Sequence, residues 1–141
     1  MKTIIGTEAD VVKELTALVA DVLARKPEAN IAVSAVDLPA EVLDALAASD
    51  IAFDKATLFQ ACEYCGAAGK GAHAVGAAFS PLMAAKPFAA VHAPDPDTDA
   101  EHAADYDAAI QAAGGLDLVI LGLGERTVSY THLRAHETPE H

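Results

Sequence analysis

The stretch at residues 116–125, Leu-Asp-Leu-Val-Ile-Leu-Gly-Leu-Gly-Glu, decides the fold of this chain. Its apolar run lies between Gly114-Gly115 and the Gly122-x-Gly124 pair, which predicts a buried parallel strand that ends in a tight glycine turn. In an open α/β sheet the ligand crevice lies at the carboxyl ends of the strands. We therefore expect functional residues directly after this strand.

Upstream of this stretch, strand-like and helix-like segments alternate. The alternation predicts a doubly wound, mostly parallel α/β sheet flanked by helices, which is a Rossmann-like fold, with no internal repeat and no domain boundary. Hydrophobic periodicity and turn residues give the individual segments. Strands are predicted at residues 2–5, 31–35, 55–61, 88–91 and 117–121, and helices at 8–26, 39–46, 80–85 and 98–113.

Several residues predict where helices start and stop. Thr7 and Asp10 have the spacing of a capping box at the start of the first helix. Ser80 and Pro81 have the residue types of an N-cap and a first-turn position. Gly114 stands where a glycine would end the last helix.

We expect the C-terminal tail to differ in origin from the rest of the sequence. Residues 128–138, Val-Ser-Tyr-Thr-His-Leu-Arg-Ala-His-Glu-Thr, resemble, residue for residue, the translation of a transposase adapter used in DNA library preparation. Such a segment is excluded from fold reasoning. We therefore divide the chain into an α/β domain at residues 1–126, expected to be truncated at its C-terminus, and an artefactual tail at 127–141.

Composition limits the classes of function. The chain has 141 residues, of which 52% are hydrophobic and 21% charged, and this balance is typical of a globular protein. Its net charge of −12 argues against binding to nucleic acid or to an anionic membrane. No signal peptide or membrane-spanning run is present, so we expect a cytoplasmic protein.

Two cysteines have a Cys-x-x-Cys spacing at Cys62 and Cys65. A zinc site with His73 and His92 and a redox pair are both open interpretations. We favour two thiols without either role, because no second cysteine pair exists and redox motifs of this type normally open a helix. Accordingly we expect no metal and no cofactor.

Four features then follow each other along the chain. The segment at 57–66, Thr-Leu-Phe-Gln-Ala-Cys-Glu-Tyr-Cys-Gly, is followed by Pro94-Asp95, by an acidic helix bearing Tyr106, and by residues 117–125. This series resembles the glucosamine-6-phosphate deaminase and 6-phosphogluconolactonase superfamily. Its members typically have a strand ending in Asp-Glu-Tyr-x-Gly and, later, a Gly-x-Gly-x-Asp-Gly-His loop.

The resemblance implies a set of site residues, and two positions differ from the family pattern. Cys62 stands where the deaminases have a proton-transferring acid, and an ordinary thiol is mostly protonated at neutral pH. Residues 34–39 stand where the family has a phosphate loop rich in glycine and threonine, yet they include no glycine, and Asp37 would repel phosphate. The implied catalytic residues are Cys62 and Glu63, and the implied substrate-binding residues are Ser34, Tyr64, Gly122, Gly124 and Glu125.

The function that the resemblance implies is that of a glucosamine-6-phosphate deaminase or isomerase of amino-sugar phosphate metabolism. The reaction is a ketose–aldose proton transfer followed by loss of ammonia, and we expect this chain to be inactive because no Asp-Gly-His follows Glu125. Two alternatives stay open: a 6-phosphogluconolactonase-like hydrolase, and a non-catalytic sugar-phosphate sensor on the same fold. The expected partner is a small sugar phosphate, and we expect the full-length protein to form a homo-oligomer.

Overall fold

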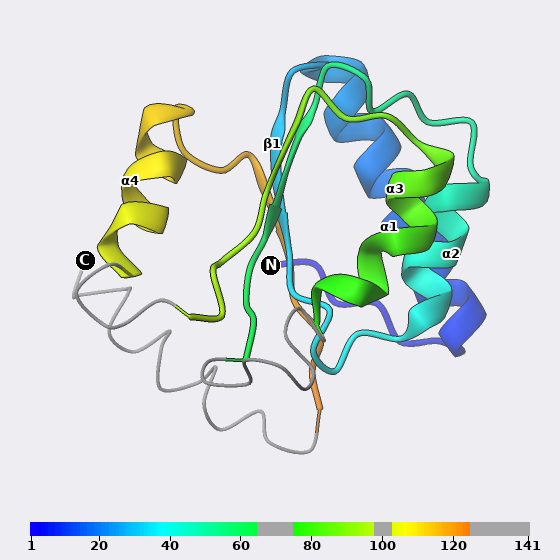
Figure 1. Ribbon diagram of the computed structural model, residues 1–141. Coiled ribbons are helices and arrows are strands. Elements are labelled where there is room, and N and C mark those ends of the chain that lie inside the picture. Colours follow the sequence, from blue (N-terminus) through cyan, green and yellow to red (C-terminus); the bar gives the residue numbers. More distant parts are fainter. Residues whose placement is uncertain (65–74, 98–102, 125–141) are drawn as a thin grey trace.

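The computed structural model describes residues 1–64, 75–97 and 103–124 (Figure 1). Strands and helices alternate along the chain, as the sequence predicts. No helix in the described ranges is long and apolar enough to cross a membrane. The elements are α1 (Glu8–Arg25), β1 (Asn30–Val33), α2 (Ala40–Ala48), β2 (Thr57–Gln60), the 3₁₀ helix η1 (Gly76–Phe79), α3 (Ser80–Ala85), β3 (Ala90–His92), α4 (Ala103–Ala112) and β4 (Leu118–Ile120).

The sheet has four strands in the order β3-β2-β1-β4, and every neighbouring pair is parallel. The connections from β1 to β2 and from β2 to β3 move in one direction along the sheet. The connection through α4 then returns to the other side of β1. Accordingly α1, α2 and α3 cover one face, and α4 lies over the other (Figure 1). The predicted doubly wound α/β fold is confirmed, and its topological switch point lies between β1 and β4.

Local hydrogen bonds fix the ends of two helices as the sequence predicts. Thr7 Oγ1 accepts the backbone N–H of Asp10, while Thr7 N donates to the Asp10 carboxylate, so the capping box is present. At the end of α4, Gly114 N donates to the carbonyl of Gln111 and Gly115 N to that of Ile110. This is a Schellman motif, and the positive φ of 96° at Gly114 explains why glycine ends the helix.

Two local predictions are wrong. Residues 2–5 form no strand, and Ile5 is 95% exposed. The edges of the described sheet are β3 and β4, so residues 2–5 have no strand neighbour, and so short an apolar run gains little burial there. Ser80 does not cap α3 with its side chain. The 3₁₀ helix η1 runs directly into α3, so Phe79 rather than Ser80 precedes the first residue, and Pro81 alone keeps its predicted place in the first turn.

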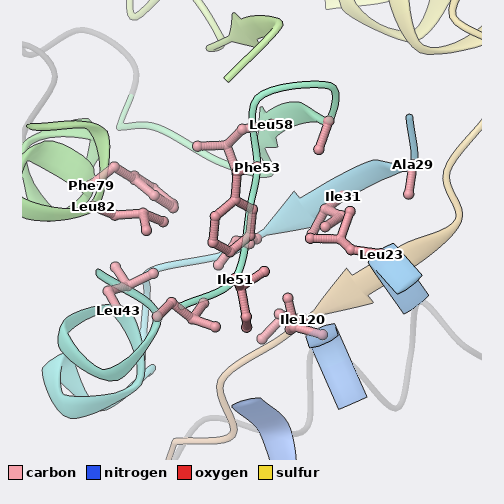
Figure 2. Packing of buried hydrophobic residues seen from close by; sticks show 14 residues of the cluster. Leu23, Ala29, Ile31, Leu43, Ile51, Phe53, Leu58, Phe79, Leu82 and Ile120 are labelled. Atoms are coloured by element: carbon pink, nitrogen blue, oxygen red, sulfur yellow. The ribbon is translucent and has the colours of Figure 1, made fainter. Parts of the chain in front are cut away.

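The main hydrophobic core lies between the sheet and the helices α1 to α3 (Figure 2). Alternate residues of β1 and β4 point to this face, as the pleat of a β-strand requires, and β2 contributes Leu58. Phe79 of η1 is fully buried in it at 0% exposure. Its other members include Val19, Leu23, Ile31, Val33, Leu43, Leu46, Leu58, Leu82 and Ile120.

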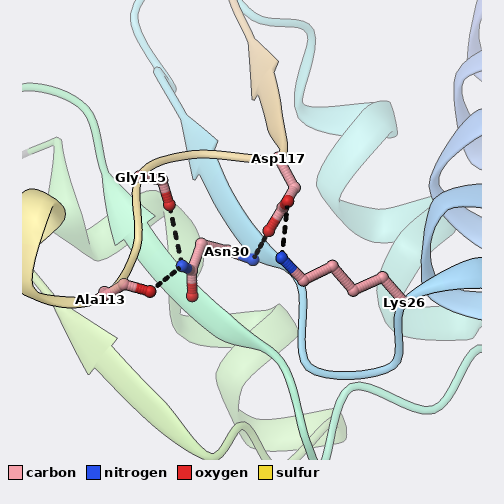
Figure 3. Close-up of polar contacts among 5 residues, drawn as sticks. All are labelled: Lys26, Asn30, Ala113, Gly115 and Asp117. Atoms are coloured by element: carbon pink, nitrogen blue, oxygen red, sulfur yellow. Dashed lines mark hydrogen bonds and ion pairs between the residues drawn. The ribbon is translucent and has the colours of Figure 1, made fainter.

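A polar junction joins the amino ends of β1 and β4 to the end of α4 (Figure 3). Asp117 Oδ2 accepts the backbone N–H of Asn30 at 2.8 Å, and Asp117 Oδ1 pairs with Lys26 Nζ at 2.9 Å. The side-chain amide of Asn30 donates to the carbonyls of Ala113 and Gly115, both at 2.8 Å. Two segments distant in sequence, 26–30 and 113–117, are therefore aligned at one point, which fixes where β4 enters the sheet.

The charge of Asp117 is expected to make the stability of this junction depend on pH. The Asn30 N–H, and after it the Lys26 side chain, hold the pKa of Asp117 below its ordinary value of 3.8. A carboxyl whose pKa is lowered on folding stabilises the protein above its unfolded pKa, and this stabilisation is lost as the pH falls through the folded value. We expect Asp117→Asn to lower the free energy of unfolding by about 1 kcal/mol at pH 7.

Urea unfolding between neutral pH and about pH 2 measures this effect. The difference between wild type and Asp117→Asn should shrink as the pH falls below about 4. Asp107→Asn on α4 is the control, because Asp107 is exposed and makes no hydrogen bond to the described residues. A difference for Asp117→Asn that stays constant with pH would contradict the prediction.

Candidate functional site

Two of the predicted site residues, Ser34 and Cys62, meet at the carboxyl ends of β1 and β2. Ser34 Oγ lies 3.3 Å from Cys62 Sγ, within hydrogen-bond distance, and Ser34 is 3% exposed. The backbone N–H of Ser34 donates to the carbonyl of Ile120 at 2.9 Å. The end of β1 is thus tied to both of its neighbours, and a hydroxyl and a thiol lie together at the edge where this fold class binds ligands.

Glu63 has its carboxylate bound to backbone amides. Oε1 accepts the N–H of Tyr64 at 2.9 Å and of Val75 at 3.1 Å, and Oε2 accepts that of Gly76 at 2.9 Å. Because Val75 is the N-cap of η1, the carboxylate satisfies amides at the start of that helix. Glu63 therefore anchors η1, and behind it Phe79, to the end of β2, while the Tyr64 side chain beside it is 58% exposed.

At the switch point the glycines after β4 pack against the loop after β1. A side-chain carbon added to Gly122 would lie 2.3 Å from the carbonyl carbon of Asp37 and 2.5 Å from the nitrogen of Leu38. One added to Gly124 would lie 2.3 Å from Asp37 Cγ. Asp37 has φ of 58° and is the one non-glycine residue with positive φ in the described ranges. Glycine is thus required at both positions. At 122 the backbone of Asp37 leaves no room for a side chain, and at 124 the carboxylate of Asp37 leaves none.

The sequence did not assign a role to Tyr106, which connects α4 to the ends of β2 and β3. Its hydroxyl lies 2.7 Å from the carbonyl oxygen of Gln60 and 3.1 Å from that of His92. Its ring meets Phe59 edge-on, and the Phe59 ring stacks on His92 at 4.7 Å. Burial raises the pKa of Tyr106 to about 12, so the hydroxyl keeps its proton and donates. The sequence signal that could have identified this residue is a tyrosine within an alanine-rich helix.

Charge is unevenly distributed between the two ends of the sheet. The loops at the carboxyl ends, in their described residues 34–39, 61–64, 93–97 and 121–124, include no lysine or arginine. Lys26, Lys55 and Lys86 each precede a strand and so lie toward the amino ends. Hence the described residues of these loops carry only negative charges, those of Asp37, Glu63, Asp95 and Asp97.

Several predicted residues cannot be placed against this site. Cys65, His73 and Glu125 lie outside the described residues, as do Arg126 and the adapter-like segment at 128–138. Within the described ranges, no three His, Cys, Asp or Glu side chains are grouped to hold a metal ion.

A separate groove of about 780 Å³ lies between α1 and α2. Ala17 and Ala45 line it, together with Glu8, Lys13 and Glu41. None of its lining residues is among the predicted site residues, and none carries a thiol or an imidazole. The thiol and the predicted site residues that the structure describes therefore lie at the strand ends and not in this groove.

A doubly wound parallel sheet whose strand ends converge at a glycine turn defines an α/β protein of the class in which ligands commonly bind at that edge. A family model described as glucosamine-6-phosphate isomerases/6-phosphogluconolactonase matches residues 6–127. The chain belongs to this family, as its motifs had indicated. A comparison with curated proteins gives no match.

Proposed function

We propose that this protein binds an amino-sugar phosphate at the carboxyl ends of β1, β2 and β4. Within its family, we assign it to the glucosamine-6-phosphate deaminases or isomerases. The observation that carries the proposal is the contact of Ser34 with Cys62 beside the glycine turn at the switch point. Hydroxyl and backbone groups there can hydrogen-bond the hydroxyls of a sugar. Family membership supports carbohydrate chemistry of the isomerase or lactonase kind.

Isomerisation between an aldose and a ketose needs a base that moves a proton between neighbouring carbons. Cys62 and Glu63 are the candidate groups from the sequence. The carboxylate of Glu63 already accepts the N–H groups of Tyr64, Val75 and Gly76, so proton abstraction by it would cost these contacts. Of these two groups, the thiol of Cys62 contacts Ser34, and it stands in place of the carboxylate that the reaction favours. Turnover should therefore be slow at most, in line with the inactivity expected from the absence of Asp-Gly-His after Glu125.

The contacts of Glu63 with the backbone of η1 favour a second function, that of a sugar-phosphate sensor that binds without turnover. With Glu63 committed to the backbone of η1, ligand binding at the end of β2 can act on the position of η1 without any covalent step. The sensor and the slow enzyme share one site and differ in whether a proton is moved.

The test combines calorimetric binding of glucosamine 6-phosphate with an ammonia-release assay on wild type, Cys62→Asp and Cys62→Ser. We expect binding by all three and an increase in turnover of about a hundredfold for Cys62→Asp, since a positioned base contributes at least this much. Cys62→Ser is the control, because it replaces the thiol without supplying a carboxylate. Binding with no turnover in any variant supports the sensor. Absence of binding overturns the proposal, and hydrolysis of 6-phosphogluconolactone would assign the lactonase activity instead.

A further inference from the structure

Gln60 differs from the other buried polar residues that the structure describes. These residues are Asn30, Ser34 and Gln60, and Gln60 is 6% exposed. The side chain of Asn30 donates to two carbonyls, and that of Ser34 contacts Cys62. The backbone carbonyl of Gln60 accepts the Tyr106 hydroxyl, yet its side-chain amide makes no hydrogen bond to the described residues. Buried polar groups are nearly always hydrogen-bonded, so this amide calls for an explanation.

The amide atoms of Gln60 keep access to solvent although the residue as a whole is buried. In the described part of the chain, no fully buried side-chain nitrogen or oxygen lacks a hydrogen bond. Since the Gln60 amide makes none there, its nitrogen and oxygen lie at an opening in the surface. Water at such an opening can be displaced by a ligand group that hydrogen-bonds equally well. A small ligand can therefore reach this amide.

Strand pairing places Gln60 at the carboxyl edge of the sheet. Gln60 is the last residue of β2 and pairs with Val33, which in turn pairs with Ile120. Val33 and Ile120 belong to the core, as does Leu58, two residues before Gln60. By the pleat of β2, the Gln60 side chain lies on the same face as that of Leu58. Gln60 is thus the polar member of the last row of side chains on this face, at the edge where this fold class binds ligands.

The chemistry of the amide indicates the class of ligand group. A glutamine amide has two N–H donors and a carbonyl acceptor, and it carries no charge. It can therefore donate to one hydroxyl group and accept from another, and hydroxyls are the commonest polar groups of a sugar. We propose that Gln60 is a ligand-binding residue whose side-chain amide hydrogen-bonds an uncharged hydroxyl group of the bound sugar. This inference rests on the proposed function and adds a binding residue to the site at the ends of β1 and β2.

The test measures calorimetric binding of glucosamine 6-phosphate to wild type, Gln60→Met and Gln111→Met. Methionine is unbranched like glutamine and of similar size, so Gln60→Met removes the amide and fills the same space. Gln111 is an exposed residue of α4, and Gln111→Met makes the same chemical change away from the sheet edge. Urea unfolding followed by circular dichroism gives the unfolding midpoint of each protein. Gln60→Leu takes the place of Gln60→Met if the methionine variant does not fold.

We expect Gln60→Met to weaken binding by about tenfold, because the ligand hydroxyl would lose its partner. Its urea midpoint should equal or exceed that of wild type, since the replaced amide makes no hydrogen bond within the described fold. Gln111→Met should bind as wild type does.

Unchanged affinity in Gln60→Met overturns the inference, whatever the midpoint. Weakened binding with a lowered midpoint also overturns it, because the amide would then support the fold and not the ligand. The same holds if Gln111→Met weakens binding as much as Gln60→Met does. Failure of the proposed function looks different, because glucosamine 6-phosphate would then not bind to wild type either, and the inference would fall with it.

Discussion

Replacing Phe79 with alanine is expected to lower the free energy of unfolding by about 3–5 kcal/mol. Phe79 is fully buried, and its ring fills the space between the sheet and the helices α2 and α3 (Figure 2). Removal of the ring takes away its transfer free energy and leaves a cavity that close-packed neighbours fill only in part. A loss of this size is a large fraction of the 5–15 kcal/mol typical of a whole domain.

Urea unfolding followed by circular dichroism gives the measurement. Met83→Ala on α3 is the control, since Met83 is 42% exposed, and its loss should stay within about 0.5 kcal/mol. Phe79→Leu should give a smaller loss in the same direction and serves if the alanine variant does not fold. Equal losses for Phe79→Ala and Met83→Ala would show that η1 contributes little to the core.

The sequence predicted the elements whose signals are local. The place of β4 followed from an apolar run between glycines, and the start of α1 followed from two side chains that bond within one turn. The expected burial of this strand is wrong, because β4 is an edge strand of the described sheet and only Ile120 in it is buried. The strand expected at residues 2–5 failed because strand formation depends on a neighbour in the sheet, which no short window of sequence supplies. The cap expected at Ser80 failed because η1 continues into α3.

For the candidate site, the sequence identified residues without their contacts. Ser34 and Cys62 were singled out by motif, and the parallel pairing of β1 with β2 places them together. The role of Glu63 depends on amides 12 and 13 residues further along the chain. Likewise the contact between Asp37 and Gly124 exists only because the sheet returns to β1 after α4. Such pairings arise from topology, and spacing in the sequence does not encode them directly.

Gly122→Ala is expected to lower the free energy of unfolding by about 3 kcal/mol or more, the upper part of the range for overpacked sites. The added carbon would lie 2.3–2.5 Å from backbone atoms of Asp37 and Leu38, and Gly122 is buried. Neither backbone can move without separating β4 from the loop after β1. Since this contact forms the switch point, the variant should also lose binding at the candidate site.

Gly124→Ala is the matched comparison, because its added carbon would meet the side chain of Asp37, which can rotate away. We expect a loss of about 1 kcal/mol for it. The loss should disappear in an Asp37→Gly background, where glycine suits the positive φ and no side chain remains. The Gly122→Ala loss should persist there, because its clash is with backbone. Urea unfolding of the singles and both doubles separates these cases. Relief of both losses by Asp37→Gly would mean that the side chain alone, and not backbone contact, requires glycine at 122.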